Sequence, residues 1–400
     1  MNEITRVSCL PKDVVCLSHL RWGFVYQRPQ HLLSRFARSH RVFFVEEPVF
    51  TDDDAPRMES HLCQDTGVTI VVPRIPNGLS QATIETMQKL LLNNLISEQN
   101  IRSYLLWYYT PMALPFSSHM KPDFTVFDCM DELSAFKDAP QEMKDRESEL
   151  LRRANIVFTG GQSLYEAKAG RHPDLHAFPS SIDYAHFAQA RSMAVEPEDQ
   201  KHIPHPRVGF AGVIDERMNI DLLGKIAELR PEIQFIMLGP VVKIDPATLP
   251  RHANIHYLGG KAYKELPAYL GGWDAAMLPF AHNESTRFIS PTKTPEYLAA
   301  GKPVVSTSIR DVVRPYAALK LVRIADTAEE FAIETDAALN VDATDPVWAA
   351  RRDDFLSKNS WDITFSRMNA LIEQRLMAKE ISSAAVNVPS RSLEAATLGD

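Results

Sequence analysis

The most informative local pattern in this 400-residue chain is Ser290-Pro-Thr-Lys-Thr-Pro-Glu-Tyr-Leu-Ala-Ala-Gly-Lys-Pro-Val-Val305. Its prolines and threonines precede a short helix, predicted over 294–300, and Gly301 is the type of residue that commonly ends a helix. Apolar strands are predicted before this helix at 275–279 and after it at 303–307. Because apolar strands that alternate with helices are typical of a parallel sheet covered on both faces, the stretch predicts an α/β fold.

The same alternation occurs in two blocks that lie on either side of a polar segment. In the first block, strands are predicted at 13–19, 41–46, 68–74, 103–109, 124–129, 156–159 and 176–178. Helices are predicted between several of them, at 29–37, 81–95, 141–154 and 163–169. The second block adds strands and helices before the opening stretch, at 208–213, 219–229, 234–238, 255–258 and 263–270. Two successive Rossmann-like units are therefore predicted.

The polar segment between the blocks is rich in proline and acidic residues, as interdomain linkers commonly are. We therefore predict an N-terminal domain over 1–190, a linker over 191–206 and a C-terminal domain over 207–357. Apolar residues recur at helical spacing after this point, which predicts a final helix over 358–378. The Ser- and Ala-rich remainder, 379–400, is predicted to be disordered.

Composition excludes several classes of protein. The formal net charge is −8, whereas nucleic-acid-binding proteins usually carry a basic surplus, so no nucleic-acid partner is expected. The start of the chain lacks the apolar run of a signal peptide, and no window has the roughly 18 uncharged apolar residues of a membrane span. Four cysteines show no close pairing or zinc-type spacing. We expect a cytoplasmic protein, with peripheral association at the inner face of a membrane left open.

Four segments of the second block resemble, in order, the C-terminal domain of GT-B glycosyltransferases, especially the GT4-like group. These segments are 207–223, 235–240, 254–280 and 293–305. The resemblance implies two Rossmann-like domains that face each other across a cleft, with a final helix that crosses back to the N-terminal domain. It also implies that the C-terminal domain binds a nucleoside diphosphate sugar, with uridine as the expected base.

The donor-binding residues are predicted from this resemblance and from helix chemistry. Unpaired N–H groups at a helix start favour an anion, and Lys293 adds a full positive charge there. We predict that the diphosphate is bound by Arg217, Ser290, Thr292, Lys293 and Thr294. The resemblance assigns donor ribose or sugar contacts to Glu296 and Glu284 and the nucleobase side to Gly239 and Tyr263. The GT4 group usually has another glutamate where Phe288 stands, so the stereochemistry of transfer stays open.

The first predicted strand leads into His19-Leu-Arg-Trp-Gly-Phe-Val-Tyr-Gln-Arg-Pro-Gln-His-Leu-Leu33, which resembles a segment of bacterial cell-surface polysaccharide glycosyltransferases. Ligands bind at the carboxyl edge of parallel strands, so Arg21, Arg28 and His31 are predicted to face the acceptor. The alternative is that the aromatic residues of this loop pack the domain and the arginines are solvated.

A base for the acceptor hydroxyl group is sought at Phe127-Asp-Cys-Met-Asp-Glu132, where another predicted strand ends. An inverting transfer needs a carboxylate or histidine within hydrogen-bond reach of that hydroxyl group. Asp131 is the first choice, with Asp128, Glu132 and His19 as competitors. A retaining transfer would need no such base, and these acidic residues could instead cap a turn or start a helix.

The chain is therefore predicted to be a metal-independent glycosyltransferase without a cofactor, because the nucleotide sugar is a substrate. The acceptor is expected to be a saccharide or a lipid-linked saccharide in polysaccharide biosynthesis. A nucleotide-sugar epimerase and a catalytically degenerate binding protein on the same fold remain alternatives. An NAD-dependent dehydrogenase is disfavoured, because neither first strand is followed by Gly-x-Gly-x-x-Gly.

Overall fold

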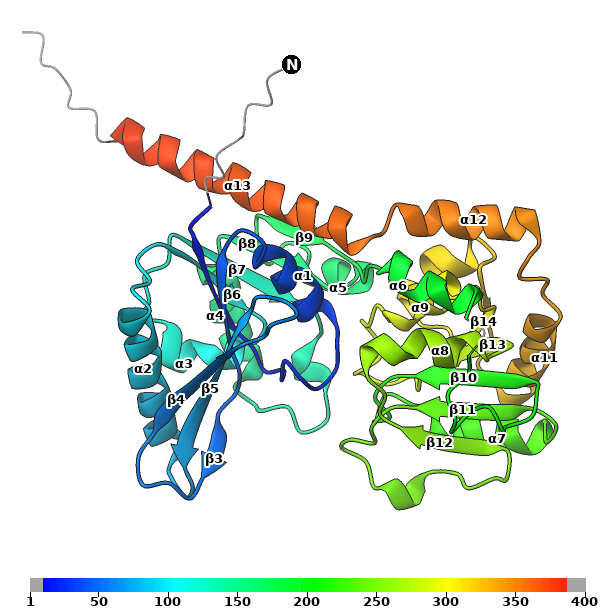
Figure 1. The fold of residues 1–400 in the computed structure, drawn as a ribbon. Coiled ribbons are helices and arrows are strands. Elements are labelled where there is room, and N and C mark those ends of the chain that lie inside the picture. The colour runs from blue at the N-terminus through cyan, green and yellow to red at the C-terminus, as the bar shows by residue number, and fades with distance from the viewer. Residues whose placement is uncertain (1–9, 194, 387–400) are drawn as a thin grey trace, which may run out of the picture.

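The computed structural model describes residues 10–193 and 195–386, and it contains two parallel-sheet domains that lie side by side (Figure 1). Each domain has its own strand order and its own buried core. The predicted α/β class and the two Rossmann-like sheets are confirmed, and each predicted strand is found with its ends shifted by a few residues.

The N-terminal sheet has the strand order β3-β5-β2-β1-β6-β7-β8-β9, with β4 antiparallel to the edge of β5. Its central strand β1 pairs in parallel with both β2 and β6, so the strand order reverses beside β1. The strands are β1 (Asp13–Leu17), β2 (Arg41–Val45), β3 (Val49–Thr51), β4 (Arg57–Leu62), β5 (Thr69–Pro76), β6 (Tyr104–Tyr108), β7 (Phe124–Cys129), β8 (Ile156–Thr159) and β9 (Leu175–Ala177). The helices are α1 (Arg28–Phe36), α2 (Gln81–Glu98), α3 (Leu114–Ser117), α4 (Met143–Arg153) and α5 (Gln162–Lys168).

The C-terminal sheet has the order β12-β11-β10-β13-β14-β15, with all neighbours parallel. The order reverses between β10 and β13, where ligands commonly bind in such sheets. Its strands are β10 (Arg207–Ala211), β11 (Gln234–Leu238), β12 (Ile255–Gly259), β13 (Ala275–Leu278), β14 (Val304–Ser306) and β15 (Val322–Ile324). Its helices are α7 (Ile220–Leu229), α8 (Leu266–Gly271), α9 (Lys293–Ala299), α10 (Arg310–Val312), α11 (Ala328–Leu339) and α12 (Pro346–Ser357).

The chain passes between the domains earlier than its composition indicates. Ile182 pairs with Ser360, and α6 (Tyr184–Ala188) already packs into the C-terminal core through Phe187. The described residues of the segment predicted as a linker, 191–193 and 195–206, belong to the C-terminal domain. Its Gln200 is fully buried and accepts a hydrogen bond from Trp273 at 2.9 Å. The prediction was wrong because a proline-rich segment can pack as a surface loop as well as connect two domains.

The last helix, α13 (Trp361–Val386), lies along the N-terminal domain, whereas α12 lies on the C-terminal domain (Figure 1). Trp361, Met368 and Ile372 are buried in the N-terminal core. The helix continues to Val386, so the prediction of disorder was wrong for 379–386, and 387–400 lie outside the described residues. No described helix is long and apolar enough to cross a membrane.

Candidate active site

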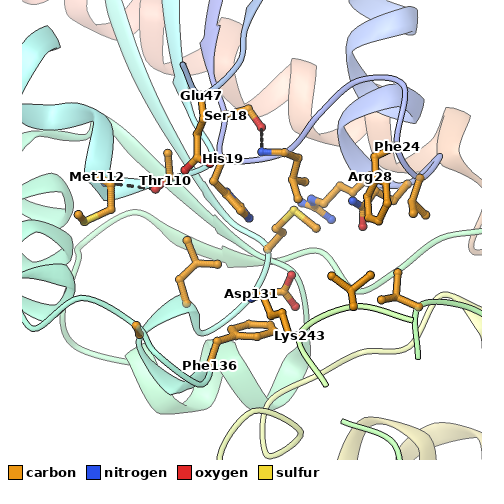
Figure 2. Close-up of a pocket in the computed structure, with 18 of the residues that line it drawn as sticks. Ser18, His19, Phe24, Arg28, Glu47, Thr110, Met112, Asp131, Phe136 and Lys243 are labelled. Carbon is orange, nitrogen blue, oxygen red and sulfur yellow. Dashed lines mark hydrogen bonds between the residues drawn. The ribbon is translucent and has the colours of Figure 1, made fainter. Parts of the chain in front are cut away.

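A cavity of about 740 Å³ lies between the domains, at the carboxyl ends of β1, β6, β7, β10 and β13 (Figure 2). Its volume is within the range of small-molecule sites. The loops that line it follow the central strands of both sheets, where the strand orders reverse. Among the predicted site residues, those that line this cavity are His19, Arg28, Asp131, Arg217, Ser290, Thr292 and Lys293.

The C-terminal wall of the cavity carries cationic side chains. Lys293 donates a hydrogen bond to Thr292 Oγ1 at 3.1 Å, and its chain passes over Gly212, where a Cβ would lie 3.0 Å from Lys293 Cε. The Arg217 guanidinium is held by the buried Asp215 carboxylate, with an Nη2–Oδ2 distance of 2.6 Å. This wall can therefore receive a diphosphate, and Gly212 leaves room for the lysine.

Lys243 is a third cation on this wall, and the sequence analysis missed it. It follows β11, and its Nζ lies 5.3 Å from the centre of the Phe136 ring of the opposite domain (Figure 2). Arg217 lies over the same ring at 5.6 Å. The position of Lys243 after β11, the strand beside β10, could have identified this residue from the sequence, because loops at that edge of the sheet face the cleft.

Two residues predicted to bind the diphosphate have other roles in the structure. Ser290 lines the cavity, but its Oγ accepts from Ser180 N at 3.4 Å and its carbonyl accepts from Ser180 Oγ at 2.6 Å. It therefore joins the donor-side loop to the segment that passes between the domains. Thr294 is fully buried beneath the start of α9 and does not line the cavity, so its assignment to the diphosphate was wrong.

The two glutamates predicted for the donor ribose or sugar lie in different environments. Glu296 is 8% exposed, and burial raises the pKa of its carboxyl group to about 7, whereas the charge of Lys293 acts to lower it. Glu296 is not part of the cavity lining. Glu284 is exposed, lies 3.5 Å from Arg287 and lines a separate hollow of about 730 Å³. The structure therefore does not bring Glu284 to the site.

The residues predicted for the nucleobase side are also placed elsewhere. Gly239 has φ 141°, and a Cβ there would collide with the Gly212 carbonyl group, so this glycine permits the close approach of two loops. Tyr263 stacks on Tyr26 of the N-terminal domain with ring centres 4.4 Å apart. Neither residue lines the cavity, and Tyr263 is a residue of the interdomain contact.

The residues predicted to face the acceptor are mainly structural. Arg21 pairs with Glu46 at 3.0 Å and holds the loop after β2. His31 is buried, stacks on Trp361 at 4.6 Å, and burial holds its pKa well below the usual value. Arg28 lines the cavity, but its buried guanidinium pairs with Asp128 at 2.9 Å. The acceptor assignment was therefore wrong for Arg21 and His31.

The structure reduces the candidates for the base to Asp131 and His19. Asp128 pairs with Arg28, and Glu132 pairs with the buried Lys168 at 2.7 Å. Burial raises the pKa of Asp131, and its carboxylate has no hydrogen bond or ion pair within the described residues.

His19 follows β1 and points toward the same part of the cavity as Asp131 (Figure 2). Burial lowers the pKa of His19 to about 4, so the ring is neutral at physiological pH. Its buried Nδ1 has no hydrogen-bond partner within the described part of the chain. Across 10–193 and 195–386, no group of three or more His, Cys, Asp or Glu residues is placed to hold a metal ion.

Comparison with solved structures identifies the fold of this protein. A sucrose-phosphate synthase from Thermosynechococcus elongatus superimposes with a TM-score of 0.66 at 14% identity, over 92% of this chain and all of that one. A trehalose 6-phosphate synthase from Burkholderia multivorans gives 0.63 at 12% identity, over 96% of this chain and 99% of that one. The fold is therefore the GT-B fold of glycosyltransferases.

Two sequence comparisons find similarity to glycosyltransferases. Residues 205–340, most of the C-terminal domain, match the model of the family described as "Glycosyl transferases group 1". A curated relative, "Putative teichuronic acid biosynthesis glycosyltransferase TuaH" of Bacillus subtilis strain 168, is 26% identical over 223 residues. That match covers 51% of this chain and 55% of the relative, or about half of each.

Proposed function

We propose that this protein transfers a sugar from a nucleoside diphosphate donor to a hydroxyl group of a saccharide acceptor in the assembly of a cell-surface polysaccharide. The observation that carries the proposal is that two walls with different chemistry face each other across one cavity. Lys293 and Lys243 provide positive charge on one wall, where Arg217 is paired with Asp215, and Asp131 and His19 lie on the other. The group 1 match and the name of the B. subtilis relative, a putative teichuronic acid biosynthesis glycosyltransferase, support it.

The proposed reaction forms a bond from the acceptor oxygen to the anomeric carbon while the bond from that carbon to the β-phosphate oxygen breaks. The nucleoside diphosphate leaves with the electron pair, and Lys293 and Lys243 stabilise its charge, with the Arg217–Asp215 pair beside them. In an inverting transfer the acceptor proton passes to Asp131, with His19 as the competing base. A retaining transfer would not require this base.

We further propose that the donor is uridine-linked, because a related fold is an Escherichia coli trehalose-phosphate enzyme "bound with UDP-2-fluoro glucose", which superimposes with a TM-score of 0.66 at 11% identity. Glu296 does not line the cavity in this structure, but we propose that it binds donor ribose or sugar hydroxyl groups once a donor is present. Its carboxyl group has no hydrogen bond within the described residues and lies one turn after Lys293. No resident cofactor or metal is proposed. The proposed location is the cytoplasm, with peripheral association at the inner face of the membrane.

Donor binding is tested with a panel of uridine and guanosine diphosphate sugars, by thermal stability and by release of free nucleotide. Lys293→Met should raise the dissociation constant for the bound nucleotide about tenfold or more, because it removes a charged contact with the diphosphate. Lys264→Met, on the exposed surface of the same domain, is the matched control. If no nucleotide sugar raises the melting temperature of the wild type, the proposal fails. An epimerised donor released without acceptor would identify an epimerase instead.

The base is tested by Asp131→Asn, which should abolish an inverting transfer and leave donor binding unchanged. Because burial raises the pKa of Asp131, wild-type turnover should fall as the pH decreases through that raised value. Full turnover in Asp131→Asn together with loss in His19→Gln would assign the base to His19. Full turnover in both variants would mean that neither residue is the base.

A further inference from the structure

The N-terminal part of the cavity differs in chemistry from the donor wall. Beyond His19, its walls come from α2, from the segment that includes α3, and from the loop that leads into α4. We call this part the apolar chamber, and its defining residues are Ile84, Met112, Phe116, Leu133 and Met143. His19 and Asp131 line the same cavity as these five residues. The chamber and the proposed reacting groups therefore line one continuous space.

Some polar groups around the chamber are engaged with the protein itself, whereas Lys137 and Asp138 are exposed. Arg146 pairs with Glu85 at 3.4 Å, and Thr110 Oγ1 accepts from Met112 N at 3.2 Å. Sugars carry many hydroxyl groups, and burying them without hydrogen bonds is unfavourable. A chamber with these walls therefore does not favour a chain of several sugar units.

Gln88 provides an independent indication that a ligand occupies the chamber. Its side chain is 8% exposed, lines the cavity and has no hydrogen bond within the described residues. A ligand that excludes water from the chamber would leave this amide in need of a partner, which a single polar atom on an otherwise apolar ligand would supply. Gln88 therefore offers a polar contact beside the apolar residues of the chamber, as in sites that orient a mostly apolar group.

We propose that the chamber binds an alkyl, acyl or aryl group of the acceptor, attached directly to the sugar that carries the attacking hydroxyl group or to its neighbour. This inference rests on the proposed function and specifies its acceptor. The growing end of a long polysaccharide would place further sugars where the chamber offers apolar walls. An earlier reaction must therefore supply a short saccharide linked to an apolar group, and later transferases extend the product.

The test measures calorimetric binding of hexyl, octyl and decyl β-D-glucoside to the full-length protein with UDP present, below the concentrations at which micelles form. Each methylene group that enters the chamber should lower the dissociation constant about fourfold, or about 0.8 kcal/mol. Phenyl β-D-glucoside is the aryl probe. Tighter binding of the phenyl than of the hexyl compound assigns the chamber to an aryl group, and the reverse order assigns it to an alkyl chain.

A matched pair of variants on α2 separates the chamber from non-specific binding. Ile84→Asp places a charge in the chamber and should remove the chain-length dependence. Leu90→Asp changes a side chain that is 54% exposed and lies outside the cavity lining, so it should leave that dependence unchanged. Affinity that is independent of chain length, or equal in wild type and Ile84→Asp, overturns the inference. If UDP binding persists in that case, the proposed donor function still stands. Chain-dependent binding without binding of any nucleotide would contradict the proposed function alone.

Discussion

Glu296 should make the stability of the protein depend on pH in a direction that can be worked out from its environment. Burial raises the pKa of its carboxyl group from 4.5 to about 7, with Lys293 acting in the opposite direction. The folded protein therefore holds this proton more tightly than the unfolded chain does. The resulting stabilisation is complete below about pH 4.5 and is lost as the pH rises through about 7.

The size of this effect follows from the two pKa values. The interval from 4.5 to about 7 corresponds to about 3 kcal/mol, because each pH unit contributes about 1.4 kcal/mol. Glu296→Gln keeps the shape of the protonated side chain and removes its ionisation. Relative to wild type, the free energy of unfolding of the variant should be similar at pH 4.5 and higher by up to about 3 kcal/mol at pH 8.

Urea titrations followed by tryptophan fluorescence at pH 4.5, 6 and 8 measure this difference. Glu284→Gln is the matched control, because its side chain is exposed and lies on the loop that leads to the same helix. The control should show no change with pH. A Glu296→Gln difference that stays constant from pH 4.5 to 8 would refute the view that burial holds this carboxyl group neutral.

Three further changes test other parts of the structure. Arg28→Met leaves the Asp128 carboxylate buried without its partner, so urea titrations should show a free energy of unfolding that is lower by about 3–5 kcal/mol. A loss below about 1 kcal/mol would mean that this ion pair does not stabilise the fold. Gly161→Ala places a methyl group against the Asp311 carboxylate of the opposite domain. If the domains shift by about 1 Å in response, kcat/KM should fall by as much as about a hundredfold. An unchanged kcat/KM would mean that this contact does not set the domain arrangement needed for catalysis. Tyr263→Phe removes a buried hydroxyl group that has no hydrogen-bond partner within the described residues. The melting temperature should therefore stay the same or rise, and the affinity for UDP should not change. Weaker UDP binding would show that Tyr263 contacts the donor after all.

The sequence predicts the strands of both sheets well because they are short apolar runs with helical segments between them. It does not predict the strands β3, β4 and β15 at the sheet edges, or the helices α11 and α12. The strands β3 and β15 have only three residues each, and β4 is mostly polar. The point where the chain passes from one domain to the other was predicted too far along the sequence. The structure places it near Ile182, which pairs with Ser360, a residue that is remote in sequence. Such a contact leaves no local pattern.

Residue type and position in the predicted loops were enough to predict that Lys293, Arg217, Asp131 and His19 line the cavity. They did not show which polar side chains are already paired within the protein. Arg21 and Arg28 are as basic as a ligand-binding arginine, and only the structure shows that Glu46 and Asp128 neutralise them. The partners lie 25 and 100 residues away along the chain, which no local motif can express.

Several residues first predicted to bind ligand instead hold the domains together near the site, and this links donor binding to the arrangement of the domains. Ser290, three residues before Lys293, is bound to Ser180 of the passage between domains. Tyr263 stacks on Tyr26 of the opposite domain, and Asp311 accepts from the Ser163 amide across the same boundary. A change in domain position must therefore move the loop that carries Lys293 relative to the wall that carries Asp131. Because transfer requires both walls at one reaction centre, these contacts would control its geometry and the exclusion of water.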